Sequence, residues 1–265
     1  MRMCSIASGS SGNCIYIGDE DTHILIDAGI SRKAIATGLK ELELSGNDLD
    51  GIFITHEHSD HVKGLGVMAR KYHIPMYGTK ETIETVKAIS SLGNIGEELF
   101  HPVAAEEELQ LKTLTVKPFK VSHDGANPVA YRVESGEKKA AVATDLGIYN
   151  DYTIEHLKGL DVILLEANHD IRMLQTCRYP YSLKQRILGK YGHLCNEMSG
   201  RLLDAILSDK MKRVFLGHLS NENNYPDLAY ESVRVEVNMR QSEYKAEDFH
   251  ISVAKRDSIS DCFEF

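Results

Sequence analysis

The residues best suited to metal chemistry stand in one short segment, His56-Glu57-His58-Ser59-Asp60-His61. It follows Gly51-Ile52-Phe53-Ile54-Thr55, whose apolar character predicts a buried strand. Because side chains alternate along an extended chain, His56 and His58 can converge on one ion at the strand's end. Asp60 and His61, where the chain turns into a helix, can reach a second ion. Neutral imidazole and carboxylate suit Zn²⁺, Mn²⁺ or Fe²⁺ and leave positions for water, so the segment predicts a metal-dependent hydrolase rather than an accidental polar loop.

A two-metal site needs more ligands, and three candidates follow other apolar runs. His123 comes after Phe119-Lys120-Val121-Ser122, Asp145 after Ala140-Ala141-Val142-Ala143-Thr144, and His218 after Val214-Phe215-Leu216-Gly217. A strand end on a rigid scaffold can fix a ligand in place. Taken alone, each of the three is more often a structural residue than a ligand.

The rest of the chain alternates short apolar runs with amphipathic segments. We expect strands at 14–17, 22–27, 51–55, 74–77, 162–165, 214–216 and 249–253, with further strands between 109 and 143. We expect helices from Ser31 through Leu42, over 62–69, after a Thr79 cap to Leu92, over 182–190 and 196–209, and after Pro226. Two mixed halves with polar residues at strand ends predict an α/β fold of stacked sheets flanked by helices, and we read 1–265 as a single domain.

Composition excludes several classes of protein. No apolar run approaches the roughly 20 residues that span a membrane, and the first residues lack a secretory signal, so we expect a cytoplasmic protein. The 5 scattered cysteines indicate reduced thiols rather than a disulfide framework or a thiolate zinc site. A net charge of −9 argues against a generic polyanion binder. Between His169 and His193, however, five basic residues accompany a single acidic one.

Together the seven candidate ligands resemble the metallo-β-lactamase superfamily, whose ligand order is His-x-His-x-Asp-His, then His, then a bridging Asp, then His. The resemblance implies an αββα four-layer sandwich of two mixed sheets flanked by helices. It implies one metal on His56, His58 and His123, the other on Asp60, His61 and His218, and Asp145 as the bridge. Asp27, in Leu25-Ile26-Asp27-Ala28-Gly29, matches the family's first motif and is expected to orient the cluster without binding metal.

Within that superfamily the chain resembles the YycJ (WalJ) family of bacterial exonucleases. The similar segments are Ala7-Ser8-Gly9-Ser10-Ser11-Gly12-Asn13, 26–29, 55–63, 143–147, 165–170, 192–197, 217–220 and 222–224. Cys195 departs from the expected Ser. The interval from Asp145 to His218 is too short for a β-CASP insert, and Asp145 stands where exported β-lactamases usually carry Cys or Ser. The resemblance implies a 5′-to-3′ exonuclease acting on duplex DNA, with two divalent ions (Mn²⁺ or Zn²⁺) and a role in mismatch repair.

Several residues fit contacts to a DNA substrate. Backbone amides and hydroxyls around Ser10, Ser11 and Asn13 can cradle a phosphate, unless this is an ordinary turn. His169 can protonate the departing oxygen or grip a phosphate, and His193 can grip a phosphate; both compete with a buried or capping role. We count Asp27, Asp60 and His169 as catalytic, and add Asn168 to the substrate contacts. Basic side chains interleaved with tyrosines can hold a backbone and stack on a base, or form helix surface and core: Arg178, Lys184 and Arg186, with Tyr179, Tyr181 and Tyr191.

Two other functions stay open. A hydrolase of small esters or cyclic phosphodiesters would need the same metals but a closed apolar pocket, whereas a nuclease needs an open groove with basic residues. A metal-bound regulatory or scaffold protein would tolerate loss of a ligand. Five further histidines are expected to be surface or packing residues: His23, His73, His101, His156 and His250.

Overall fold

The computed structural model describes residues 1–240 and 243–265, and its strands form two seven-stranded sheets. The first sheet contains, in spatial order, β14 (Phe263–Glu264), β1 (Arg2–Ala7), β2 (Cys14–Gly18), β3 (His23–Ile26), β4 (Gly51–Phe53), β5 (Met76–Gly78) and β6 (Phe100–Pro102). The second contains β13 (His250–Val253), β12 (Arg213–Gly217), β11 (Val162–Glu166), β10 (Lys138–Ala143), β9 (Val129–Ser135), β8 (Leu114–Lys120) and β7 (Leu109–Leu111). Both sheets are mixed. Pairing is antiparallel from β14 to β3 and from β7 to β10, and parallel from β3 to β6 and from β10 to β13.

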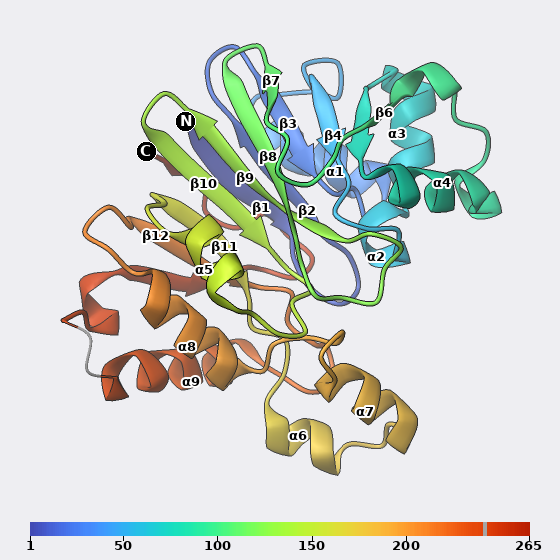
Figure 1. The fold of residues 1–265 in the computed structure, drawn as a ribbon. Coiled ribbons are helices and arrows are strands. Elements are labelled where there is room, and N and C mark those ends of the chain that lie inside the picture. The colour runs from blue at the N-terminus through green and yellow to red at the C-terminus, as the bar shows by residue number, and fades with distance from the viewer. Residues whose placement is uncertain (241–242) are drawn as a thin grey trace.

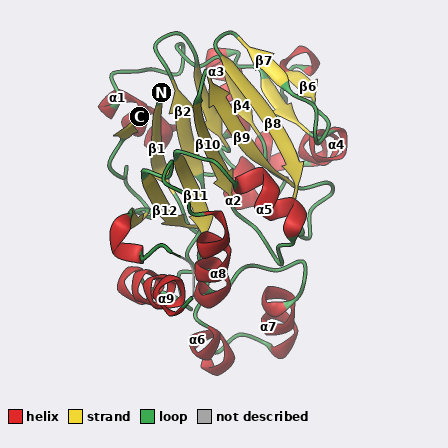
Figure 2. Cartoon of the chain, turned by 60° about the vertical axis from the view of Figure 1, so that its left-hand side comes forward, coloured by secondary structure: helices red, strands yellow, loops and turns green. Residues whose placement is uncertain are grey.

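Helices cover the outer face of each sheet, as Figures 1 and 2 show. The first sheet carries α1 (Arg32–Glu41), α2 (Ser59–Val62), α3 (Leu65–Tyr72) and α4 (Lys80–Ala88), with short 3-10 turns at Ser90–Leu92 and Glu97–Leu99. The second carries α5 (Asp151–Leu157), α8 (Asn196–Ile206) and α9 (Pro226–Met239), with a 3-10 turn at Ala246–Asp248. Two more helices, α6 (Ile171–Thr176) and α7 (Tyr181–Leu188), project below the sheets as an arm. The predicted αββα sandwich is confirmed.

Three apolar layers hold this sandwich together, and strand periodicity produces them. In β10 and β11, Ala141 and Ile163 face the helices α8 and α9, whereas Val142 and Leu164 face the opposite sheet. Successive side chains of a strand point to opposite faces, so a strand buried on both faces is apolar throughout. A third cluster packs the other sheet against α1, α3 and α4. The strands are thereby fixed from both sides, which makes their ends rigid supports for polar side chains.

Most predicted elements are confirmed, with differences at their ends. Ser31 and Thr79 cap α1 and α4 through their side chains. The helix expected over 62–69 is two helices, because the chain breaks near Gly64, where a Cβ would lie 2.3 Å from the Ile30 carbonyl oxygen. The helix expected to reach Leu92 ends at Ala88. Strands β1, β6 and β14 and helices α5 and α6 were not anticipated.

Two further findings bear on the composition. All five cysteines are free thiols in this structure. Within 1–240 and 243–265, none of the helices has the length and apolar character required to span a bilayer.

Candidate metal centre and adjoining cleft

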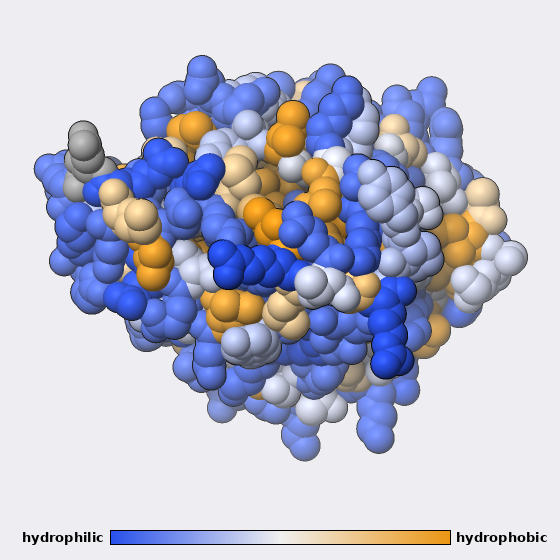
Figure 3. Space-filling view, turned by 90° about the horizontal axis from the view of Figure 1, so that it is seen from below, coloured by the Kyte–Doolittle hydropathy of each residue, from blue (hydrophilic) through white to orange (hydrophobic). Residues whose placement is uncertain are grey.

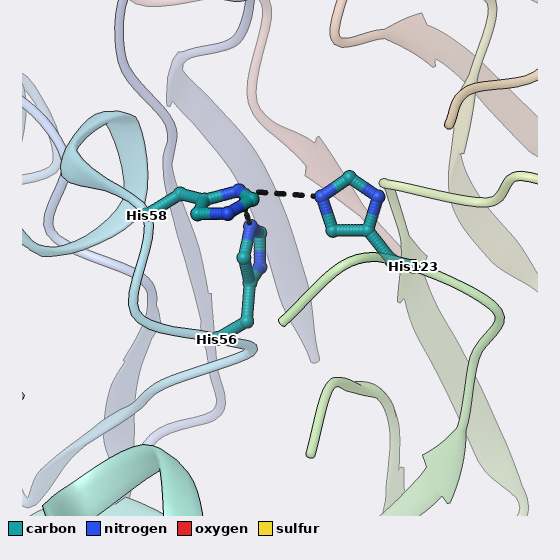
Figure 4. A group of neighbouring side chains, drawn as sticks. All are labelled: His56, His58 and His123. Carbon is teal, nitrogen blue, oxygen red and sulfur yellow. Dashed lines mark hydrogen bonds between the residues drawn. The ribbon is translucent and has the colours of Figure 1, made fainter. Parts of the chain in front are cut away.

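Three imidazoles meet at the end of β4, and Figure 4 shows how they face one another. His56 and His58 lie on the loop after this strand, and His123 reaches them from the loop after β8. His58 Nδ1 lies 3.0 Å from His56 Nε2 and 3.3 Å from His123 Nε2. The three nitrogens lie within 4.8 Å of one another, close enough to bind one ion. These are the residues predicted for the first metal.

A second group lies beside the first. Asp60 Oδ2 is 3.4 Å from His61 Nε2 and 3.3 Å from His218 Nε2. Asp60 and His61 belong to α2, whereas His218 follows β12 of the other sheet. These three ligand atoms also lie within 4.8 Å of one another. They are the residues predicted for the second metal.

Asp145 lies between the two groups. Its Oδ1 is 3.5 Å from His123 Nε2 and 3.7 Å from His218 Nε2, and its Oδ2 is 3.2 Å from His61 Nε2. The side chain is buried, yet Oδ2 accepts no hydrogen bond from any described residue. A buried carboxylate oxygen without a donor is costly, and a cation at this point would satisfy it. The arrangement therefore fits divalent metal ions, with Asp145 in the position of a shared ligand.

Asp27 anchors the first sheet's side of the cluster. Its Oδ2 accepts hydrogen bonds from His61 Nδ1 at 2.7 Å and from Thr55 Oγ1 at 2.8 Å, and its Oδ1 accepts one from the Thr55 amide at 2.8 Å. Thr55 Oγ1 also lies 3.1 Å from His56 Nδ1. Because their Nδ1 atoms are held in this way, the His61 and His56 rings present Nε2 to the centre. Carboxylates commonly orient metal-binding imidazoles in this manner.

Glu166 performs the same task on the second sheet's side, although it was not among the predicted site residues. This fully buried carboxylate accepts hydrogen bonds from His218 Nδ1 at 2.9 Å and from His193 Nδ1 at 2.8 Å. It also accepts hydrogen bonds from the amides of Leu146 and Leu194. The sequence did contain a signal for Glu166: it stands at the end of an apolar strand, the position that marked the other candidate ligands.

Three of these residues have a left-handed backbone: φ is 62° at Asp27, 59° at Asp145 and 54° at His218. Each lies one or two residues beyond a strand, where the chain must turn sharply. This conformation is unfavourable for residues with a Cβ, by roughly 1–2 kcal/mol each. Such strain persists when the surroundings fix the residue, and it clusters at functional sites.

The charges of the cluster balance one another. Burial alone would raise the pKa of Asp145, but the His218, His61 and His56 rings outweigh it and hold that pKa well below its usual value. Burial alone would lower the pKa of His218, but Asp145 and neighbouring carboxylates raise it to about 10. For Glu166, His193 and His218 overcome burial and lower the pKa to about 2. The buried carboxylates thus require positive charge among them, which divalent cations supply.

A cleft of about 430 Å³ opens over this centre. His58, Asp60, Asp145 and His218 form one wall. Four of the predicted substrate contacts line the rest: Ser10, Asn168, Arg186 and His193. Tyr179, Leu183 and Ile187 complete the side formed by the α6–α7 arm. Figure 3 shows the molecule from below, the end where this arm lies, with apolar side chains near the middle of the face and hydrophilic ones around them.

Other predicted contacts do not line this cleft. Asn13 is completely buried: its Oδ1 accepts a hydrogen bond from the Gly9 amide, and its Nδ2 lies 3.2 Å from His61 Nε2, so it shapes the loop and the centre from behind. Lys184 Nζ donates to the carbonyl oxygens of Gln175 and Cys177, both at 2.7 Å, and so ties α7 to α6.

The remaining predicted residues lie nearby but outside the cleft. Ser11 lines a separate pocket beside α1. Arg178 is exposed between α6 and α7. His169 is buried, with Nδ1 3.3 Å from Asn168 Oδ1, and burial lowers its pKa to about 4. Tyr181 is exposed on the arm, and Tyr191 lines a pocket with Tyr152.

Residues 22–218 match the family described as the beta-lactamase superfamily domain. The chain belongs to the beta-lactamase superfamily. Within this superfamily it is 40% identical over 228 residues to exodeoxyribonuclease YycJ of Bacillus anthracis, covering 86% of each chain. It is 38% identical over 225 residues to exodeoxyribonuclease WalJ of Streptococcus pneumoniae serotype 2, covering 85% of this chain and 84% of that one. The predicted family is confirmed.

Two solved structures have the same fold as this chain. Zn²⁺-bound PqqB from Methylobacterium extorquens superposes with a TM-score of 0.72 at 18% identity, covering 98% of this chain and 100% of that chain. Unliganded yeast PDE1 gives a TM-score of 0.70 at 15% identity, covering 97% and 98%. At these identities the likeness concerns the architecture alone.

Proposed function

We propose that this protein is a metal-dependent phosphodiesterase that degrades duplex DNA from the 5′ end. Two divalent ions would be held by the two groups described above, one by His56, His58 and His123 and the other by Asp60, His61 and His218, with Asp145 shared. The observation that carries the proposal is this full set of seven side chains, in a chain that matches an exodeoxyribonuclease over 86% of its length. Mismatch repair, a cytoplasmic location and a single domain over 1–265 belong to the same proposal.

The metal ions, when bound, would supply a hydroxide nucleophile at neutral pH and neutralise charge on the phosphate. Around them, the chain's own residues bind and orient the substrate. Arg186 reaches the cleft from α7 and offers a guanidinium to a phosphate, while Ser10 and Asn168 line the same cleft. Tyr179 offers a ring to a base at the cleft's edge.

Proton donation to the departing oxygen suits His193 better than His169. His193 lines the cleft, its Nδ1 is held by Glu166, and the same Nδ1 lies 3.4 Å from Asp145 Oδ1. Its Nε2 is therefore the atom available to a substrate. His169 is buried and does not line the cleft, so we assign it the support of Asn168.

The character of the cleft favours DNA over a small ester. Its walls are mainly polar and include one arginine, whereas a closed apolar pocket would suit a lactone or thioester. The complete ligand set also favours an enzyme over a metal-bound scaffold.

End-labelled duplex DNA tests this function directly. Native protein with Mn²⁺, and in a parallel series with Zn²⁺, should release nucleotides stepwise from the 5′ end. Asp145→Ala should release none, while the control His101→Ala, whose exposed side chain lies on β6, should match the native rate. Robust digestion by Asp145→Ala would refute the role of Asp145. No digestion by native protein, together with hydrolysis of small esters, would refute the nuclease.

A further inference from the structure

Asp124 connects the candidate metal centre to the α6–α7 arm. It directly follows His123, and its Oδ1 lies 3.4 Å from His123 Nε2 and 3.7 Å from His58 Nε2. On its other side, Arg186 donates to both carboxylate oxygens: Nη2 to Oδ1 at 3.1 Å, and Nε to Oδ2. One carboxylate therefore spans the gap between two ligands of the first metal and a side chain of α7.

Arg186 is well placed to contact a phosphate. Within the part of the chain that the structure describes, it is the one Lys or Arg lining the cleft over the metal centre. The arm that carries it projects from the body of the sandwich, and no residue of α7 is fully buried. Arginine side chains are long and mobile, so an unsupported guanidinium would sample many positions. The paired contact with Asp124 fixes both the position and the plane of the guanidinium.

Resting on the proposed nuclease function, we propose that Asp124 is a positioning residue that holds Arg186 over the metal centre and yields it to the substrate's phosphate. A phosphodiester offers two oxygens in the same fork-shaped arrangement as a carboxylate, so it can replace Asp124 as the partner of Arg186. An uncharged ester or lactone cannot compete with a carboxylate for a guanidinium. This exchange of Asp124 for phosphate as the partner of Arg186 therefore both selects phosphodiesters and orients them.

Asp124 also lies where it could have a second role. Because its Oδ1 lies near two imidazoles of the first group, the carboxylate could act by holding metal rather than by holding Arg186. The two roles differ in what they predict when Arg186 is absent. A residue that acts through Arg186 has no effect without it, whereas a metal ligand keeps its effect.

A double-mutant cycle on the holoenzyme distinguishes them: native protein, Asp124→Asn, Arg186→Ala and the double variant, assayed on end-labelled duplex DNA with metal content measured in each. Arg186→Ala should raise KM and lower kcat, each by about 10-fold or more, because it removes both a charge-assisted contact to phosphate and the orientation that this contact gives the substrate. Asp124→Asn should lower kcat by about 10-fold without loss of metal, because Arg186 is no longer oriented. The double variant should equal Arg186→Ala alone. Arg186→Lys, which keeps the charge but loses the fork, should not restore the native kcat/KM.

A binding measurement without turnover provides the second readout. In chelator, fluorescence anisotropy with a labelled duplex over a salt series should show tighter binding for Asp124→Asn than for native protein, by about 3-fold at low salt, since Arg186 is released from its partner. Arg186→Ala should lower the salt slope by about one. The matched control is Arg201→Ala, which breaks a surface pair with Glu236 (3.1 Å) on α8 and α9 and should change neither readout.

Failure of the positioning role and failure of the proposed nuclease function give different results. If Asp124→Asn loses metal, or if its effect persists in the Arg186→Ala background, the positioning role is wrong and Asp124 acts at the metals. If native protein digests no DNA, the proposed function is wrong. In that case the anisotropy series still tests the Asp124–Arg186 exchange, and equal affinity of native protein and Asp124→Asn for the duplex overturns it.

Discussion

At the scale of single residues, the centre depends on carboxylates that bind no substrate. Asp27 and Glu166 lie on opposite sheets, are fully buried, and each accepts a hydrogen bond from the Nδ1 of an imidazole that faces the centre. The left-handed backbone at Asp27, Asp145 and His218 adds rigidity of another kind, because it aims side chains in directions that a strand cannot. Both devices fix ligands before any metal binds.

Asp27→Asn tests the first of these anchors. The amide keeps the shape of the carboxylate but loses its charge, so His61 is held less firmly. We expect a 10- to 100-fold weaker metal affinity, roughly the effect of losing such an outer partner. Competition titration with a metal-sensitive dye measures it, with Asp21→Asn, an exposed residue, as the control. Unchanged affinity would contradict the assigned role.

Glu166→Gln tests the second anchor, and here we expect a loss of stability as well. Four N–H groups point at this carboxylate, and an amide cannot accept all four because one of its two ends is itself a donor. We expect the metal-free protein to lose about 1–3 kcal/mol in urea unfolding, as for buried donors without an acceptor. The control Glu236→Gln, which alters a surface pair, should change the free energy of unfolding by less than about 0.5 kcal/mol. Equal stability of Glu166→Gln and native protein would show that Glu166 is not needed as an acceptor.

At the scale of elements, the loops that carry the ligands are locked to one another through their backbones. The Asn13 amide donates to the Asp60 carbonyl at 2.8 Å, the Ala28 amide to the His61 carbonyl at 2.8 Å, and the Gly29 amide to the Asn13 carbonyl at 2.7 Å. The loops after β1, β3 and β4 therefore move together. Close approach of this kind leaves no room for a Cβ at Gly29, where it would lie 1.6 Å from the Asp60 carbonyl oxygen.

Gly29→Ala should therefore displace Asp60 and His61. We expect destabilisation of about 2 kcal/mol or more, as in overpacked cores, together with reduced metal content. Gly136→Ala is the matched control, because Gly136 has a φ of 59° but no atom within 4 Å of its Cβ position. It should lower stability by about 1–2 kcal/mol and leave metal content unchanged. Equal metal content in both variants would show that the loop contact does not position the ligands.

Asp19 links the two sheets at the opposite end, and its effect depends on pH. Its carboxylate accepts hydrogen bonds from the hydroxyls of Thr113 and Ser135 and from the amides of Asp21 and Thr22. Burial alone would raise the pKa of Asp19, but these hydrogen bonds outweigh it and lower the pKa. A lowered folded-state pKa means that the stabilisation is present above the unfolded value of about 3.9 and is lost as the pH falls below it.

Urea unfolding of the metal-free protein at pH 6 and pH 3 measures this contribution. Native protein should lose more stability than Asp19→Asn between these pH values. The difference should be below about 1 kcal/mol, because the group is partly exposed. An identical pH dependence of the two proteins would contradict this role of Asp19.

At the scale of the whole molecule, the centre lies where the two sheets meet. His56, His58, Asp60 and His61 come from the first sheet's loops, whereas His123, Asp145 and His218 come from the second's. Neither half holds a complete set, so bound metals would tie the halves together. The same arrangement determines which site residues could be predicted from the sequence alone.

Local patterns singled out the first four candidate ligands, because they lie close together in the chain and follow one strand: His56, His58, Asp60 and His61. The pairing of His123, Asp145 and His218 with them rested on resemblance, because no local pattern reports contacts over such separations. Glu166 was missed because its partner His218 lies 52 positions away. Lys184 and Arg186 could not be told apart, since only the packing of α7 determines that one faces Asp124 and the other α6.

Metal content per chain tests the central claim most directly. Protein dialysed against Mn²⁺ or Zn²⁺ and then assayed by elemental analysis should hold two ions per chain in the native form, as the proposed ligand groups require. Asp145→Ala should hold fewer, and His101→Ala the native number. Native protein that binds no divalent ion, or an Asp145→Ala variant that binds as many as native protein, would contradict the account.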